Sequence, residues 1–252
     1  RVQFTPDLLP ADLVGTMVFN QATGQFAPRK GPIFANIILA DEINRAPAKV
    51  QSALLECMQE RQVTLGDATY PLEPPFFVLA TQNPIEHEGT YPLPEAQLDR
   101  FMTKLLVRYP AFDEEVRIVR LVGTERPIPV SRVLDRRALA GLQRLAERIH
   151  VDERIEEYIV RLVVATRPLK EGAADFHRYI EYGASPRASI YAYRLARIRA
   201  LLDGRPFVIP EDVKAVLPAV LRHRLILSYE AESERLAPDD IIGELLARVA
   251  VP

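Results

Sequence analysis

The 252-residue chain lacks several features that would place it in a particular class of protein. It has a single cysteine, Cys57, so no disulfide can form within it, which fits the reducing cytoplasm. No stretch reaches the ~18 consecutive apolar residues that a membrane-spanning helix needs. An excess of one charge is also lacking: 32 basic and 34 acidic residues give a net charge of -2, so no bulk attraction to nucleic acid or anionic lipid is expected. What remains is a globular composition, long enough for one large domain or two modest ones.

The first ~110 residues alternate strand-like and helix-like patterns, which indicates a parallel α/β sheet. Apolar runs predict four strands, at 1–4, 36–40, 76–81 and 103–109. The run at 36–40 suits a strand buried on both faces. A helix is predicted at 47–60, with Pro47 at its first position. Two hairpins are predicted, at 15–34 and 61–72.

From Pro110 onward, apolar residues recur at helical spacing and no convincing strand is present. One such stripe consists of Leu195, Ile198, Leu201 and Leu202. We therefore expect an α/β core at 1–110 and an all-helical domain at 111–252.

Two of the predicted strands end in polar groups that suit nucleotide chemistry. Asp41 and Glu42 follow one strand, and Thr81, Gln82, Asn83 and Pro84 follow another. Ligands of open parallel sheets bind beyond the carboxyl ends of the strands. There, one carboxylate can hold Mg²⁺ and the next can orient or polarise an attacking water, while Asn83 can fix that water. Taken singly, the acids could open a solvated loop and Asn83 could belong to a simple turn, but two such ends in register favour a site.

Further candidates are less specific. Arg187 follows Ser185 and Pro186, which suit a helix start, and a positive helix end is a natural phosphate site; an ordinary helix start with a solvated arginine is the alternative. Arg100 fits an arginine finger that reaches the phosphates of a neighbouring subunit, or a surface salt bridge, and Arg108 is a second candidate for that role. His87, between two glutamates, is expected to lie in a solvated loop rather than to bind metal.

Three blocks of the sequence together resemble the MoxR family of AAA+ ATPases: "ADEINRAPAKVQSALLECMQERQVT", "LATQNPIEHEGTYPLPEAQLDRF" and "GASPRAS". The resemblance runs over nearly the whole chain and is strongest across 31–108. It implies a P-loop NTPase fold of the AAA+ type, with sheet order 5-1-4-3-2, followed by a helical lid. By this resemblance the site residues take these roles: Asp41 and Glu42 match the Walker B pair, Asn83 sensor 1, Arg100 the arginine finger and Arg187 sensor 2.

The resemblance also implies ATP and Mg²⁺ as cofactors and a ring-shaped homo-oligomer, a hexamer. In such a ring the hairpins at 15–34 and 61–72 would face the pore and touch client proteins. Hydrolysis would drive remodelling, maturation or metal-cofactor insertion of partners, among them von Willebrand factor A domain proteins.

One departure from the family pattern is the P-loop, G-x-x-x-x-G-K-[ST], of which the sequence has no copy. The sequence also begins at Arg1 within a strand-like stretch, so we expect an N-terminal truncation that removes the central strand. The strands at 76–81 and 103–109 would then flank a vacant lane, roughly twice the usual ~4.8 Å apart. Such a fragment would be marginally stable and inactive alone.

Two other readings stay open. Helicases and chelatase subunits share the clade, so a nucleic-acid-directed motor is one alternative, although the hairpins carry only Arg29, Lys30 and Arg61 as basic residues. A non-catalytic interaction module is the other.

Overall fold

The computed structural model describes residues 1–83, 89–123, 130–167 and 175–252, so His87 lies outside the described residues. The chain forms two compact units, Arg1–Phe101 and Met102–Pro252. The division falls before the boundary at 110 that the sequence suggested. The backbone N–H of Lys104 donates to the carbonyl of Ala219 at 2.9 Å, which ties the start of the connecting segment to the second unit.

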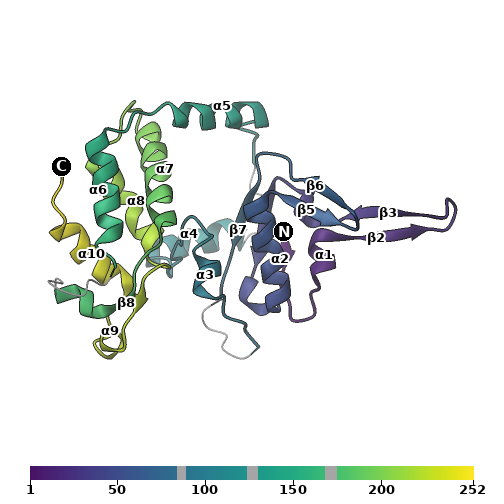
Figure 1. Ribbon diagram of the computed structural model, residues 1–252, viewed down its shortest axis with the longest axis horizontal. Coiled ribbons are helices and arrows are strands. Elements are labelled where there is room, and N and C mark those ends of the chain that lie inside the picture. Colours follow the sequence, from purple (N-terminus) through teal and green to yellow (C-terminus); the bar gives the residue numbers. More distant parts are fainter. Residues whose placement is uncertain (84–88, 124–129, 168–174) are drawn as a thin grey trace. The chain divides into compact units, whose positions relative to one another are not determined.

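The first unit combines a parallel sheet with two hairpins (Figure 1). Its elements are β1 (Val2–Gln3), α1 (Pro10–Val14), β2 (Gly15–Asn20), β3 (Gln25–Lys30), β4 (Ile37–Asp41), α2 (Ala48–Glu60), β5 (Gln62–Leu65), β6 (Ala68–Pro71), β7 (Phe77–Ala80) and α3 (Glu95–Leu98). The parallel strands lie in the order β1-β4-β7, while β2 pairs with β3 and β5 with β6. This order agrees with strands 2, 3 and 4 of the expected sheet.

The central strand β4 is buried on one face. Ile38 and Ala40 are buried in one core with Leu54 and Leu55 of α2, whereas Ile37 on the opposite face is 62% exposed. Alternate side chains of a strand point to opposite faces. The expectation of burial on both faces is therefore wrong for the part of the chain that the structure describes.

The predicted strand at 103–109 is also absent: these residues have no regular secondary structure, and Val107 is 98% exposed. A strand needs a neighbouring ladder to satisfy its N–H and C=O groups. Residues 103–109 belong to the second unit and form no strand. The expected wide spacing between a strand at 103–109 and the strand at 76–81 therefore cannot be measured in the structure. Among the described residues, β7 pairs with β4 alone, and Phe77 and Leu79 of β7 are about half exposed.

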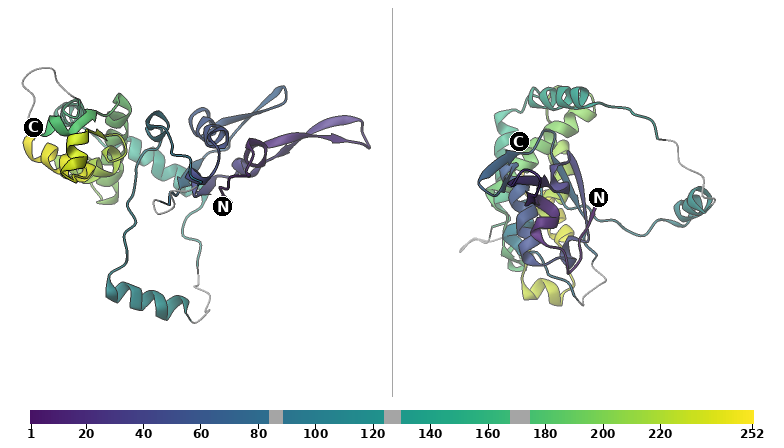
Figure 2. Two further views of the ribbon diagram at one scale, coloured as in Figure 1. Left: turned by 90° about the horizontal axis from the view of Figure 1, so that it is seen from below. Right: turned by 90° about the vertical axis from the view of Figure 1, so that its right-hand side faces the viewer.

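The second unit is mainly helical (Figures 1 and 2). Its elements are α4 (Phe112–Val122), α5 (Arg136–Glu147), α6 (Glu153–Val164), β8 (Ile180–Tyr182), α7 (Pro186–Leu202), α8 (Pro210–Leu221), β9 (Ile226–Leu227), α9 (Tyr229–Ser233) and α10 (Pro238–Arg248). Residues of α6, α7, α8 and α10 form its core. The short antiparallel pair β8–β9 departs from the all-helical expectation, because strands of two or three residues carry no readable periodicity. None of the helices described has the length and apolar character needed to cross a membrane.

The most deeply buried residues of helix α7 are small ones. The alanines at four-residue spacing are all buried: Ala188, Ala192, Ala196 and Ala200. The stripe predicted from leucines and isoleucine is instead partly on the surface, with Ile198 40% and Leu202 78% exposed. An alanine face lets a neighbouring helix approach closely, which a hydrophobicity count does not reveal.

Candidate functional site

The paired acids lie where β4 ends. Asp41 is the last residue of the strand, and Glu42 adopts the left-handed conformation with φ 55° and ψ 50°. That conformation is unfavourable for a residue other than glycine, by about 1–2 kcal/mol. It turns the chain out of the sheet directly after Asp41. Both side chains are mostly covered yet reach solvent, at 19% exposure for Asp41 and 24% for Glu42.

Thr81, which directly follows β7, holds the two acids together. Its hydroxyl donates to Oδ1 of Asp41 at 2.5 Å and accepts from the backbone N–H of Glu42 at 2.9 Å. Its carbonyl also accepts from the N–H of Ile43 at 3.0 Å. One side chain at the end of β7 thus fixes both the carboxylate of Asp41 and the backbone that orients Glu42.

The neighbouring strand β1 and the residue before it supply partners for both carboxylates. Its register sets Gln3 beside Asp41. Arg1 donates to Oδ2 of Asp41 from Nε at 3.0 Å and from Nη2 at 2.5 Å, and the amide of Gln3 donates to Oε2 of Glu42 at 2.8 Å. The hydrogen bond from Thr81, followed by that from Arg1, lowers the pKa of Asp41, so this carboxyl is ionised at neutral pH.

The loops beyond the strands are fixed by polar contacts as well. The side-chain amide of Asn44 donates to the carbonyl of Asn83 at 3.3 Å, and the carbonyl of Asn44 accepts from the N–H of Tyr91 at 2.6 Å. Buried Gln51 of α2 donates from Nε2 to the carbonyls of Ile43, Ala46 and Tyr91 at 3.2, 3.1 and 3.0 Å. The segment after Glu42 is therefore held against both α2 and the loop that precedes α3.

The predicted site residues fall into two groups. Asp41, Glu42 and Asn83 lie at one edge of the sheet, as the sequence indicated. Arg100 is half-buried in the same unit and follows α3. Its backbone N–H donates a hydrogen bond to the carbonyl of Gln97 at 3.1 Å.

The remaining predicted arginines belong to the second unit. Arg187 is half-buried in the first turn of α7, and its N–H donates to Oγ of the capping Ser185 at 3.2 Å. Arg108 is exposed. The helix start predicted at Ser185 is thus present.

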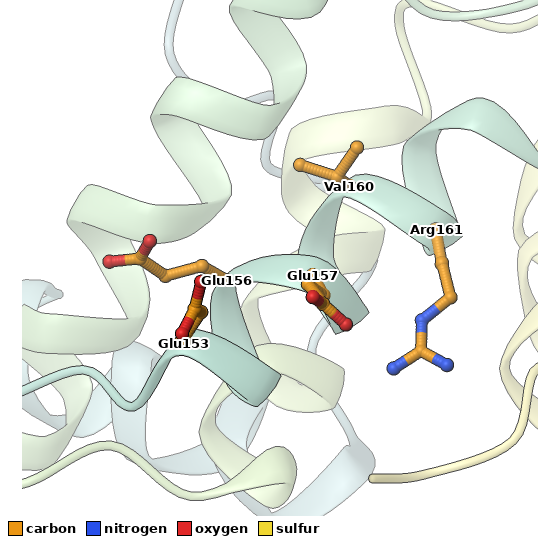
Figure 3. A pocket seen from close by; sticks show the side chains of 5 residues that line it. All are labelled: Glu153, Glu156, Glu157, Val160 and Arg161. Carbon is orange, nitrogen blue, oxygen red and sulfur yellow. The ribbon is translucent and has the colours of Figure 1, made fainter.

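A hollow of about 460 Å³ on the second unit contains none of the predicted site residues (Figure 3). A single helix, α6, lines it with Glu153, Glu156, Glu157, Val160 and Arg161. Within the described ranges, no group of three or more His, Cys, Asp or Glu side chains could hold a metal ion. A cation at Asp41 would therefore need oxygens from another source.

Comparison with known proteins identifies the family. Residues 1–103 match the "ATPase family associated with various cellular activities (AAA)", and residues 172–245 match the "AAA lid domain". The chain is 50% identical over 253 residues to Chaperone MoxR1 of Mycobacterium tuberculosis, covering all of this chain and 67% of that protein. The chain belongs to the MoxR family of AAA+ ATPases. Protein MoxR of Paracoccus denitrificans is 33% identical over 279 residues, with 79% of that protein covered.

The family's fold is confirmed as well. A solved structure from Cytophaga hutchinsonii matches with a TM-score of 0.92 at 50% identity, covering all of this chain and 77% of that one. The chain thus has the AAA+ fold, a parallel sheet with a helical lid. MoxR membership implies a nucleotide and, typically, Mg²⁺ as its partner.

Sequence reasoning did not assign a role to Arg1, Gln3, Arg45 or Gln51. Arg45 donates to Oε2 of Glu42 at 3.1 Å, one turn after the acid. A signal existed for Gln51 alone: it is a polar residue on the buried stripe of α2, and buried polar groups need partners. Nothing in the local sequence links Arg1 or Gln3 to acids about forty residues away.

Proposed function

We propose that this MoxR-family chain carries the hydrolytic half of an ATPase site. In this proposal Asp41 holds Mg²⁺, Glu42 orients the attacking water and Asn83 senses the terminal phosphate. Arg100 acts as the finger toward a neighbouring subunit, and Arg187 contacts phosphate from the lid. The observation that carries the proposal is the Thr81 hydroxyl, which bonds both Asp41 and the backbone of Glu42 at the carboxyl ends of adjacent strands.

The carboxylate oxygens at this site suit Mg²⁺ bound together with a nucleotide rather than Mg²⁺ alone. Mg²⁺ takes oxygen ligands and is usually held by one or two carboxylates plus substrate phosphates. Asp41 has a lowered pKa and is ionised, and the described residues include no group of three or more His, Cys, Asp or Glu side chains that could hold a metal ion. When bound, the ion would neutralise charge that develops on the phosphates; the protein's own part is to fix Asp41 through Thr81 and to aim Glu42.

We further propose the domain roles 1–110 for the AAA+ core and 111–252 for the lid that carries Arg187. The sequence has no G-x-x-x-x-G-K-[ST], whose backbone N–H groups and lysine cradle phosphates. The 252-residue chain alone should therefore not turn over ATP. Robust hydrolysis by this purified chain would contradict that expectation.

The cellular role we propose is that of a chaperone-like machine in the cytoplasm. A hexameric ring would couple hydrolysis to remodelling, maturation or metal-cofactor insertion of clients, with von Willebrand factor A domain proteins as partners. The name Chaperone MoxR1, carried by a 50% identical relative, supports the chaperone class.

The test is Glu42→Gln in a chain extended at its N-terminus by a P-loop segment. ATP binding should persist, while turnover should fall by at least about a hundredfold, because the amide cannot polarise water as the carboxylate does. Glu56→Gln, an exposed acid on α2, is the matched control and should leave turnover unchanged. Normal turnover in Glu42→Gln would remove Glu42 from the role.

A further inference from the structure

The hairpin β2–β3 projects from the first unit (Figures 1 and 2). Its two faces differ in character. In its ladder Met17 is opposite Pro28, and Phe19 is opposite Phe26. Side chains of a strand alternate, so these four residues share one face with Lys30. The opposite face carries mainly polar residues: Thr16, Val18, Asn20, Gln25, Ala27 and Arg29.

The base of the apolar face is covered by the second hairpin. Nζ of Lys30 lies 4.8 Å from the ring centroid of Phe34 and 5.2 Å from that of Tyr70 in β6. A Cβ placed on Gly66, in the turn between β5 and β6, would lie 3.2 Å from Cγ of Met17. The β5–β6 hairpin therefore packs on this face as far as Met17.

The distal half of the same face is open. The Phe19 and Phe26 rings contact one another with centroids 5.2 Å apart, yet these residues are 50% and 66% exposed. An exposed aromatic pair that continues a packed apolar face is typical of an interaction surface.

The two edges of the hairpin differ in what they can bind. The N–H of Gly31 donates to the carbonyl of Val14, so these two residues form a hydrogen-bonded pair. Hydrogen-bonded and non-hydrogen-bonded pairs alternate along an antiparallel ladder, so Met17 and Phe19 both belong to non-hydrogen-bonded pairs. The backbone groups of Met17 and Phe19 therefore point away from β3. On β3, the outward position of Pro28 has no N–H, which blocks strand addition at that edge. The edge of β2 is the one able to accept a further strand.

Charge identifies the kind of partner. Residues 15–28 contain no ionisable side chain. Nucleic-acid binding rests on lysine and arginine contacts to phosphates, and Lys30 at the base is already placed over two rings. We propose that the β2 edge and the Phe19–Phe26 pair bind an extended, uncharged apolar segment of a client polypeptide by strand addition. This deepens the proposed chaperone function and rests on it for the client's identity, but the binding step itself requires no ATP hydrolysis.

The test measures fluorescence anisotropy of a labelled, capped ten-residue peptide of alternating Thr and Val with one central Phe, without nucleotide. A matched peptide is N-methylated at alternate residues, so that it keeps its side chains and loses the donors of one edge. We expect the N-methylated peptide to lose binding, and Phe26→Ser to weaken binding of the parent peptide by about tenfold or more. Val18→Ser, on β2 and on the opposite face of the hairpin, should stay within about twofold.

Several outcomes would overturn the proposal: equal binding of the N-methylated peptide, no effect of Phe26→Ser, equal affinity for a twenty-nucleotide oligo-dT, or a Phe26-dependent dimer in sedimentation that displaces the peptide. The N-methyl comparison needs no protein variant, so misfolding cannot obscure it. Loss of ATP turnover with intact peptide binding would refute the proposed ATPase and leave this surface standing.

Discussion

Gln51 offers the sharpest test of how the segment after the paired acids is held. Its side chain is buried, with 1% exposure, and its Nε2 contacts three backbone carbonyls, those of Ile43, Ala46 and Tyr91. An amide nitrogen has only two N–H donors, so these three contacts share two hydrogens. Gln51→Met keeps the length of the side chain and removes both donors.

The magnitude follows from two donors lost in a buried site. A typical intramolecular hydrogen bond contributes about 0.5–1.5 kcal/mol net, and a buried acceptor left unsatisfied costs about 1–3 kcal/mol. Part of this cost is offset because moving a methionine side chain from water into the protein interior is more favourable than moving a glutamine side chain. We expect a local destabilisation of about 2 kcal/mol, which corresponds to roughly thirtyfold in an opening equilibrium.

Hydrogen exchange with mass spectrometry can measure this effect locally, without assuming that the two units unfold together. The backbone amides to follow are those of Arg45 and Tyr91, which bond to the carbonyls of Glu42 and Asn44. Their exchange should accelerate by about thirtyfold in Gln51→Met. Gln59→Met, at an exposed position of the same helix, is the control and should change little. If the two variants exchange alike at these amides, Gln51 does not hold the segment.

Three further predictions concern single titratable groups. Thr81→Val removes the hydrogen bond that does most to lower the pKa of Asp41, so this pKa should rise toward its ordinary value in a carboxyl NMR titration. An unchanged pKa would contradict the role of the hydroxyl. Arg205→Leu removes the arginine partner of the Asp212 carboxylate, which is 2% exposed. The free energy of unfolding of the second unit, measured with urea, should fall by about 3 kcal/mol. In the wild type, burial alone would raise the pKa of Asp212, but bonds led by that from Arg205 lower it, so the stabilisation is present above pH ~4 and is lost as pH falls below it. Burial raises the pKa of Cys57 to about 11, so native Cys57 should react with iodoacetamide at pH 8 roughly a hundredfold more slowly than in urea; equal rates would show that the thiol is accessible.

The parts of the fold that sequence reasoning captured are those with a strong local pattern. The strand ending in Asp41 carries an apolar run, and the hairpin turning at Gly66 has glycine with φ 60°, which the turn needs. Helix α2 starts after Pro47, which serves as its N-cap rather than its first helical residue. Such features depend on neighbours within a few residues and are therefore visible in the chain itself.

The predictions of secondary structure and burial that were wrong depend on which element packs against the segment. Residues 103–109 have an adequate strand sequence, but strand formation needs a ladder partner, and none of the described strands pairs with them. Helix α7 has two possible packing faces, and the alanine face is buried, which leaves Leu202 exposed. Composition and period do not decide between two faces; the shape of the neighbouring helix does.

The candidate site shows the same division between local and distant causes. Two carboxylates at a strand end were readable, because strand, acid and turn are consecutive. Their state was not, since Arg1 and Thr81 reach Asp41 across forty residues of sequence. This arrangement has a chemical consequence: a cation that binds Asp41 must compete with the guanidinium of Arg1, and the carboxylate alone offers few free oxygens for that exchange. In the proposed ATPase, phosphate oxygens that arrive with the cation would supply the missing ligands, so we expect a metal delivered with its nucleotide rather than a resident ion.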